Sequence, residues 1–255
     1  MEIELLILCC AALVAGFIDA IVGGGGLVQT PATLITLPQF PVATLLGTTK
    51  IPSFFGTSIA TVQYARKVAL QWKLLGAMSV AAFIASYSGS LTVSHISNSF
   101  MKPVMFCILI AVVIYTYSKK NFGTATTEPK SARHEFIYGT SFALVIGFYN
   151  GFIGPGTGSF LVMFFISLLG FDFLKASAHA KFVNLATNMG SIIFFAGNGN
   201  ILFNYAIPMA VCNLTGSFLG ARLAILKGNK FIRVFFLIVV VGTIIRFGYD
   251  IFIKK

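Results

Sequence analysis

Charged residues are scarce in this sequence, and acidic ones scarcest of all. The chain of 255 residues contains seven Asp and Glu against eighteen Lys and Arg, so that only 10% of its residues are charged. Soluble domains contain about 25% charged residues. The hydrophobic share is 57%, and the mean hydropathy is +0.90. This composition excludes an ordinary soluble protein and predicts an all-α integral membrane protein that crosses the bilayer several times.

Motifs of several other function classes are also missing. The sequence contains no G-x-x-x-x-G-K-[ST] phosphate loop and no soluble domain, which argues against nucleotide-driven transport by this chain alone. Its three histidines form no metal-binding motif. None of them is placed in the sequence where it could plausibly activate a serine or cysteine nucleophile. The four cysteines lie in apolar segments without metal-type spacing and are interpreted as small hydrophobic residues: Cys9, Cys10, Cys107 and Cys212. We therefore expect neither an enzyme nor a bound metal or other cofactor.

Long apolar runs dominate what remains. A helix needs roughly 20 apolar residues to cross the hydrocarbon core, and eight stretches approach this length. They are 3–22, 42–65, 71–93, 101–118, 136–153, 173–196, 201–224 and 231–252. Two shorter stretches, 27–37 and 159–170, follow clusters of glycine and are too short to cross as upright helices. The sequence thus predicts a polytopic protein with about eight long transmembrane helices.

Two features that are energetically unfavourable in a membrane helix each occur twice in the sequence, and both recur after the same number of residues. The first is a glycine cluster, Gly23–Gly26, and the second is a lysine within an apolar stretch, Lys50. Glycine weakens a helix by about 1 kcal/mol per residue, and a charge at membrane depth costs several kcal/mol. Gly154, Gly156 and Lys181 repeat these landmarks 131 positions after their counterparts. We therefore predict two pseudo-symmetric repeats, 1–118 and 136–255, joined by a polar loop at 119–135, each with one glycine-broken, re-entrant helix and three spans.

The relative orientation of the repeats depends on how often the broken segment crosses. If it crosses once, the basic clusters at 66–73 and 227–233 fall on opposite sides of the membrane. If it enters and returns, both clusters share one side with the cluster at 119–133. Lys and Arg accumulate on cytoplasmic loops, so we favour inverted repeats, although Lys254 and Lys255 then lie outside. The net charge of +11 is interpreted as this topology signal and not as a surface for nucleic acid.

Several segments together resemble a known family. GFIDAIVGGGG, GTTKIPSFFGT, GFYNGFIGPGTGSF, ASAHAKFVNLATN and GSFLGARLAILKG resemble the TauE/SafE family of membrane transporters, named for sulfite export and also linked to organosulfonates. The resemblance covers nearly the whole chain and implies a multi-pass, secondary transporter of the bacterial inner (plasma) membrane for small sulfur-containing anions. Two departures are Pro155 in the second glycine motif and Asn150 at the position that corresponds to Asp19.

The glycine clusters are candidate anion sites. A helix that begins after a glycine turn presents unpaired N–H groups and its positive dipole end to whatever lies in front of it. The alternative is that the glycines only permit close helix crossings, but four glycines in a row break a helix, which favours the site. The candidate residues are Gly24, Gly25 and Gly26 in the first repeat and Gly156, Thr157 and Gly158 in the second.

The two buried lysines are the other candidate binding residues. Lys50 lies eight residues into its stretch, roughly 12 Å deep at 1.5 Å per residue, against a half-thickness of about 15 Å. Helical spacing places Lys50 on one face with Ser53 and Thr57, and Lys181 with Asn184 and Asn188. Lysine, hydroxyl and amide groups suit an oxyanion. The alternative is that the lysines extend to the membrane surface.

Two further residues are candidates for coupling to protons. Asp19 is the only acid well inside a predicted span, and His179 lies two residues before Lys181. The alternatives are that Asp19 pairs with a lysine or caps the broken backbone and that His179 is simply hydrogen-bonded. We expect a carrier whose partners are a small anionic solute and membrane lipid, or an anion channel of the same architecture.

Overall fold

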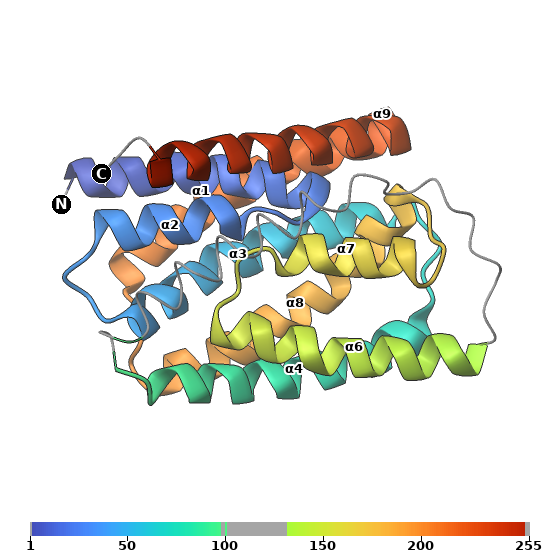
Figure 1. Ribbon diagram of the computed structural model, residues 1–255, viewed down its shortest axis with the longest axis horizontal. Helices are drawn as coiled ribbons and strands as arrows, with labels where there is room; N and C mark the ends of the chain where they lie inside the picture. Colours follow the sequence, from blue (N-terminus) through green and yellow to red (C-terminus); the bar gives the residue numbers. More distant parts are fainter. Residues whose placement is uncertain (1, 98–99, 101–131, 253–255) are drawn as a thin grey trace.

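The structure is a bundle of helices. A computed structural model describes residues 2–97, 100 and 132–252, in which all regular secondary structure is helical. Figure 1 shows long helices lying side by side, with short helices among them. The predicted all-helical class is confirmed for these residues. The helices are α1 (Glu2–Val22), α2 (Gly26–Thr36), α3 (Val42–Ala65), α4 (Trp72–Ser94), α6 (Ala132–Phe152), α7 (Thr157–Ser167), α8 (Phe173–Gly197) and α9 (Phe203–Phe252).

Most predicted spans correspond to single helices. The span predicted at 42–65 has the same bounds as α3, and the other predicted bounds differ from the observed ones by a few residues. Gly228 has non-helical backbone angles and divides α9 into two parts, which correspond to the separate spans predicted at 201–224 and 231–252. Helix α6 begins at Ala132, inside the predicted polar loop. The span predicted at 101–118, with Cys107, and the remainder of that loop lie outside the described residues.

Three helices in the described part of the chain are long and apolar enough to cross a membrane by length and composition. They are Glu2–Val22, Trp72–Ser94 and Phe203–Gly228, that is, α1, α4 and the first part of α9. Helices α3 and α8 have 24 and 25 residues but carry buried polar side chains, including both lysines. Lipid cannot satisfy such groups, so α3 and α8 belong in the protein interior, where they pack against each other.

Helix boundaries repeat at the spacing found in the sequence. Helices α2 and α7 each have 11 residues, and Thr157 lies 131 positions after Gly26. The first residues of α3 and α8, and those of α4 and α9, are separated by the same number. Packing follows this correspondence crosswise, because α1 packs against α9 and α6 packs against α4. The first helix of each half therefore contacts the fourth helix of the other half.

Glycines bring the helices of these two pairs close together. A Cβ atom added at Gly16 of α1 would collide with the backbone oxygen of Asn213 in α9. The corresponding atom at Gly147 of α6 would meet the backbone of Ala82 in α4, and the positions in both contacts are 131 residues apart. Small residues permit such crossings in membranes. Close helix packing is a sufficient explanation for Gly16 and Gly147, in contrast to the glycine clusters that interrupt the helices.

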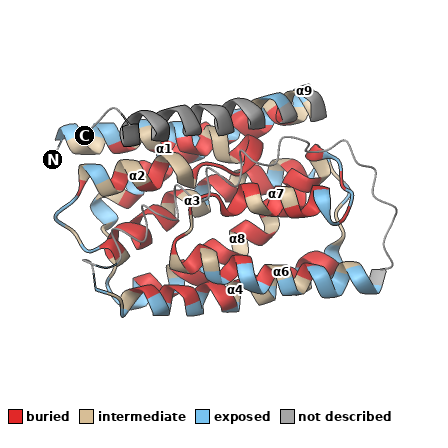
Figure 2. Cartoon of the chain, viewed as in Figure 1, coloured by how far each residue is buried: buried red, intermediate tan, exposed pale blue. Residues whose placement is uncertain are grey.

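Burial divides the helices into inner and outer faces. Figure 2 shows buried residues on the sides that face the bundle interior and exposed ones on the outer sides of α4 and α6. Many exposed side chains are large and apolar, such as Leu6, Val80 and Val211. Contiguous exposed apolar surface is unusual for a soluble monomer, and here it is the surface that lipid would cover. Polar side chains gather inside, where they form the candidate site.

Candidate functional site

The site is built around two breaks in the helical backbone. Gly23 follows α1 and has a φ angle of 80°, and Gly154 follows α6 and has a φ angle of 95°. These are corresponding positions, and glycine reaches such angles without the steric cost of a side chain. The two breaks touch each other. The backbone N–H of Ser159 donates to Gly23 O at 3.0 Å, and the Ser159 hydroxyl donates to Val22 O at 3.1 Å.

A small cavity lies at these breaks. Its volume is about 30 Å³, measured as the space open to the centre of a water molecule, and one buried water needs about 10–15 Å³ on this measure. Of the predicted site residues, nine line it: Asp19, Gly26, Lys50, Ser53, Gly156, Thr157, Gly158, Asn184 and Asn188. Five do not line it: Gly24, Gly25, Thr57, His179 and Lys181. Lining residues come from both halves of the chain.

Both lysines are buried inside the bundle. The relative exposure is 5% for Lys50 and 1% for Lys181. A lysine that extended to the membrane surface would leave its ammonium group accessible at the end of the helix. Each ammonium group instead donates hydrogen bonds to oxygen atoms of another helix. The structure therefore disfavours the alternative in which these lysines only reach the lipid headgroups.

Each lysine contacts the opposite half of the chain. Lys50 Nζ, on α3, donates to the backbone oxygen of Asn150 at 2.6 Å and to its Oδ1 atom at 2.7 Å. Lys181 Nζ, on α8, donates to the backbone oxygen of Asp19 and to its Oδ2 atom, the latter at 2.9 Å. Lys181 corresponds to Lys50 and Asn150 to Asp19. The two contacts are thus copies of one arrangement, each with one backbone and one side-chain acceptor.

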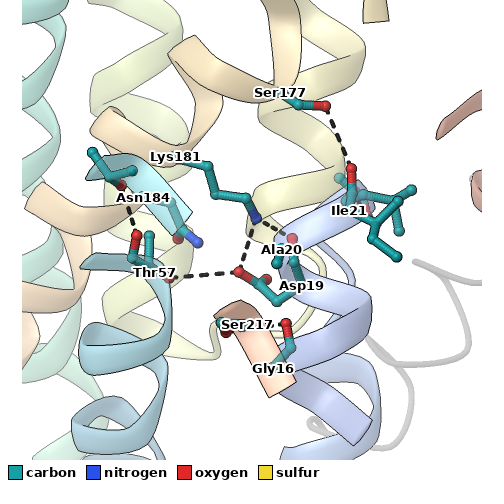
Figure 3. Close-up of polar contacts among 12 residues, drawn as sticks. Gly16, Asp19, Ala20, Ile21, Thr57, Ser177, Lys181, Asn184 and Ser217 are labelled. Atoms are coloured by element: carbon teal, nitrogen blue, oxygen red, sulfur yellow. Dashed lines mark hydrogen bonds and ion pairs between the residues drawn. The ribbon is translucent and has the colours of Figure 1, made fainter. Parts of the chain in front are cut away.

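Asp19 forms an ion pair and accepts further hydrogen bonds. Lys181 and Thr57 both point toward its carboxylate, from α8 and α3 (Figure 3). The Thr57 hydroxyl donates to Asp19 Oδ2 at 3.5 Å, and the backbone oxygen of Asp19 accepts from Gly23 N at 2.8 Å. The structure therefore contains the lysine pairing that the sequence left open as an alternative.

The asparagines of α8 supply amide groups to the cavity wall. Asn184 Oδ1 accepts a long hydrogen bond of 3.5 Å from Asn150 Nδ2. Asn188 is only 2% exposed, and its Nδ2 atom has no hydrogen-bond partner among the described residues. A buried donor without a partner costs about 1–3 kcal/mol. Asn188 Nδ2 is thus a donor in the cavity wall that a solute can use.

His179 lies away from the cavity in a fully buried position. Its Nε2 atom accepts a hydrogen bond from Gln71 N at 3.1 Å, so its Nδ1–H donates to Lys175 O at 2.8 Å. Phe165 and Phe171 pack against the ring. Nε2 therefore joins α8 to the segment before α4, whereas Nδ1 bonds within α8 itself. This geometry favours the hydrogen-bonded alternative over a coupling role.

A polar network beside the cavity was not predicted from the sequence. Gln29 Nε2 donates to Thr49 O at 3.1 Å, and Asn213 Nδ2 donates to Gln29 Oε1 at 2.9 Å. Ser217 extends the network from Asn213 to the backbone of Gly16. These bonds tie α2 to α3 and α9 and so fix one of the short helices. The signal in the sequence was Asn213, a polar residue in the middle of an apolar stretch.

Metal-binding groups are not gathered here. No cluster of three or more His, Cys, Asp or Glu side chains with metal-binding geometry occurs in the part of the chain that the structure describes. The charged residues that line the cavity there are Lys50 and Asp19. With a lysine, two helix starts and several amide and hydroxyl groups, this site suits a small polar solute and offers no assembled nucleophile.

Comparison with known proteins identifies the family. The family model described as "Sulfite exporter TauE/SafE" matches residues 8–247. A probable membrane transporter protein, ORF9, from Sinorhizobium sp. is 36% identical over 96% of this chain and 93% of its own length. A probable membrane transporter from Haemophilus influenzae is 34% identical over 90% of this chain and 88% of its own length. The probable membrane transporter YfcA of Escherichia coli K12 is 32% identical, with coverage of 96% and 89%.

No solved structure matches the chain significantly. The family match covers both glycine breaks and both lysines, and it confirms the resemblance found in the sequence motifs. The relatives are described as membrane transporters, in agreement with the absence of catalytic motifs from the sequence. This chain belongs to the TauE/SafE family and is a membrane-embedded transporter of a small solute, not an enzyme.

Proposed function

We propose that this protein is a secondary transporter that moves a small anion of the sulfite and organosulfonate class across the inner membrane. The observation that carries the proposal is the cavity at the two helix breaks. It is lined by Lys50 and by Asn188, whose Nδ2 atom has no hydrogen-bond partner among the described residues. A buried positive charge without a carboxylate partner favours a negative solute. The name of the matched family, which refers to sulfite export, supports the same substrate class.

The helix N-termini and the side chains make different contributions to anion binding. Gly26, Gly156, Thr157 and Gly158 line the cavity at the first residues of α2 and α7, where the positive dipole ends of the two helices favour an anion. Lys50 supplies a full charge. Ser53, Asn184 and Asn188 supply hydrogen-bonding groups, whereas Lys181 and Thr57 act through their contacts with Asp19.

The two halves, 1–118 and 136–255, are proposed to form an inverted repeat of helices around this site. In Figure 1, α2 runs from the middle of the bundle toward the left end and α7 runs from the middle toward the right end. The matched helix boundaries and the crosswise packing of α1 with α9 and α6 with α4 support this arrangement. Transporters of inverted repeats expose a midplane site alternately to each side by moving one bundle against the other.

Proton coupling, where present, is assigned to Asp19. Its carboxylate lines the cavity and is 16% exposed, so that it is open to a solute or water there. Protonation would remove the negative member of the ion pair and leave the charge of Lys181 without its partner. The positive charge available to an anion would then rise, which links proton uptake to anion binding. His179 is the weaker coupling candidate because its ring nitrogens bond to Gln71 and Lys175.

Transport by purified protein in liposomes tests the proposed function. We expect uptake of sulfite to saturate with concentration and to be accelerated by unlabelled sulfite on the opposite side, because a carrier exchanges one bound solute for another. Electrical recording on the same liposomes distinguishes the alternative. A large current that follows the anion gradient without saturation would contradict the carrier and identify an anion channel, and no flux of any small sulfur-containing anion would contradict both.

Gly154→Ala is expected to weaken anion binding. A Cβ atom at this position would lie 2.7 Å from Lys50 Nζ, so the ammonium group must move away from its place at the cavity. We expect sulfite affinity to fall at least tenfold, measured as the ligand-induced shift in the thermal unfolding midpoint. Gly199→Ala is the matched control, because Gly199 has a similar φ of 69° and nothing within 4 Å of its added Cβ. Equal losses in both variants would attribute the effect to backbone strain alone.

A further inference from the structure

The two halves of the site differ by one charge. Asp19 and Asn150 occupy corresponding positions, and each accepts hydrogen bonds from the lysine of the other half through one backbone and one side-chain oxygen. The side chains are close in shape, but the carboxylate carries a full negative charge and the amide carries none. The two lysine contacts are therefore alike in geometry and unlike in electrostatics.

This difference leaves one positive charge at the cavity. Lys181 is neutralised by Asp19, whose Oδ2 atom lies 2.9 Å from its ammonium nitrogen. The acceptors of Lys50 are the backbone and amide oxygens of Asn150, which carry only partial charges. Among the described residues that line the cavity, Lys50 and Asp19 are the charged ones. Lys50, Asp19 and Lys181 together sum to a single positive charge.

Because the site is buried, its net charge strongly affects which anion it can bind. Lys50, Lys181 and Asn188 are each 5% exposed or less, so the site is largely shielded from bulk water. A buried site opposes any net charge that is left without compensation. A monoanion would bring the site to neutrality, whereas a dianion would leave one uncompensated negative charge. Asn188 Nδ2 adds a neutral donor, which can bind an oxygen atom but cannot balance a second charge.

We propose that the site selects compact monoanions over dianions and that the ion pair between Asp19 and Lys181 sets this selectivity. The inference rests on the proposed function, in which this cavity binds the transported anion. It specifies the substrate class by charge: hydrogen sulfite and small sulfonates are accepted, and sulfate and the fully ionised forms of similar anions are rejected. The asymmetry between Asp19 and Asn150 is thus a device for charge selection within a duplicated site.

Methanesulfonate and sulfate are the probes that test it. Both are tetrahedral at sulfur and similar in size, but methanesulfonate carries one negative charge and sulfate carries two. Affinities are measured on the purified full-length protein from ligand-dependent shifts in thermal unfolding, at constant ionic strength. For the unmodified protein we expect methanesulfonate to bind at least tenfold more tightly than sulfate, which corresponds to about 1.4 kcal/mol.

Three variants move the charge in a defined way. Asn150→Asp places a carboxylate beside Lys50, so binding of both probes should fall at least tenfold. Asp19→Asn releases the charge of Lys181, so the preference should shift toward sulfate by at least tenfold. The double variant D19N/N150D transfers the ion pair to the other half and should restore the preference for methanesulfonate. If Asp19→Asn does not fold, Asn150→Asp and the double variant still decide the question.

The outcomes separate this inference from the proposed function. Equal binding of sulfate and methanesulfonate by the unmodified protein, or one unchanged ratio in all folded variants, would overturn charge selection and leave an anion transporter. Failure of methanesulfonate, sulfate and sulfite alike to bind the unmodified protein would contradict the proposed function itself. Restoration of the preference by the double variant is the result that a purely structural role of Asp19 would not produce.

Discussion

Lys50→Met is expected to weaken anion binding by roughly 10–100-fold and to slow transport accordingly, while the protein remains folded. Lys50 supplies the positive charge in the cavity that no carboxylate compensates in the described part of the chain. Hydrogen bonds to charged groups are worth about 1.5–3 kcal/mol, which corresponds to roughly 10–100-fold in affinity. Methionine has a similar length and volume and carries no charge. Its introduction also removes the cost of burying an ammonium group that lies at only 5% exposure.

The measurements are sulfite flux into liposomes and sulfite-dependent shifts in thermal unfolding, with gel filtration to show that the variant is folded. Lys73→Met is the matched control, since Lys73 is exposed near the start of α4 and does not line the cavity. It changes the net charge of the protein equally and should leave both measurements unaltered. Normal sulfite flux by folded Lys50→Met protein would remove Lys50 from the binding site.

The sequence predicted the described helices well, because the residues that are unfavourable in a membrane helix are few and recur at one spacing. The bounds predicted for α3 match the structure, and the helix breaks lie where glycines interrupt apolar runs. In a membrane, long apolar runs leave few alternatives to helices. The helix boundaries also repeat at the spacing of 131 positions that the glycines and lysines indicated. The apolar composition and the positions of the glycines were therefore sufficient to predict these helices.

The crosswise arrangement could not be predicted in the same way. The sequence shows that Lys50 corresponds to Lys181 and Asp19 to Asn150, but it does not show which lysine contacts which partner. Contact within one half and contact across the halves are equally compatible with the spacing. The structure pairs each lysine with the opposite half of the chain, because α1 and α6 pack on helices of the opposite half.

Treating the two lysines as equivalent also hid a difference between them. Lys50 lines the cavity, whereas Lys181 lies behind Asp19 and does not. The substitution of Asn150 for Asp at the corresponding position was visible in the sequence. Its electrostatic consequence became visible only when the structure placed each of these residues against a lysine. Removal of Lys50 and removal of Lys181 are therefore expected to have different effects.

Lys181→Met is expected to destabilise the folded protein, in contrast to Lys50→Met. Removing one member of a buried ion pair leaves an uncompensated charge and costs about 3–5 kcal/mol. From the part of the chain that the structure describes, the carboxylate of Asp19 would then keep the hydrogen bond from Thr57 alone, which is long at 3.5 Å. We expect a lower thermal unfolding midpoint in detergent and a smaller yield of monodisperse protein. Lys50→Met, compared at one heating rate, should show smaller changes, because it leaves neutral acceptors of Asn150, and not a charge, without this donor.

The double variant D19N/K181M separates the lost ion pair from lost packing. It removes both charges, so the buried site contains no uncompensated carboxylate and most of the stability should return. Such recovery is expected only if the two residues interact directly, because distant substitutions add independently. Additive losses in the double variant would show that Lys181 stabilises the bundle through packing alone. A Lys181→Met protein as stable as the unmodified one would contradict the ion pair, on which the electrostatic difference between the two halves depends.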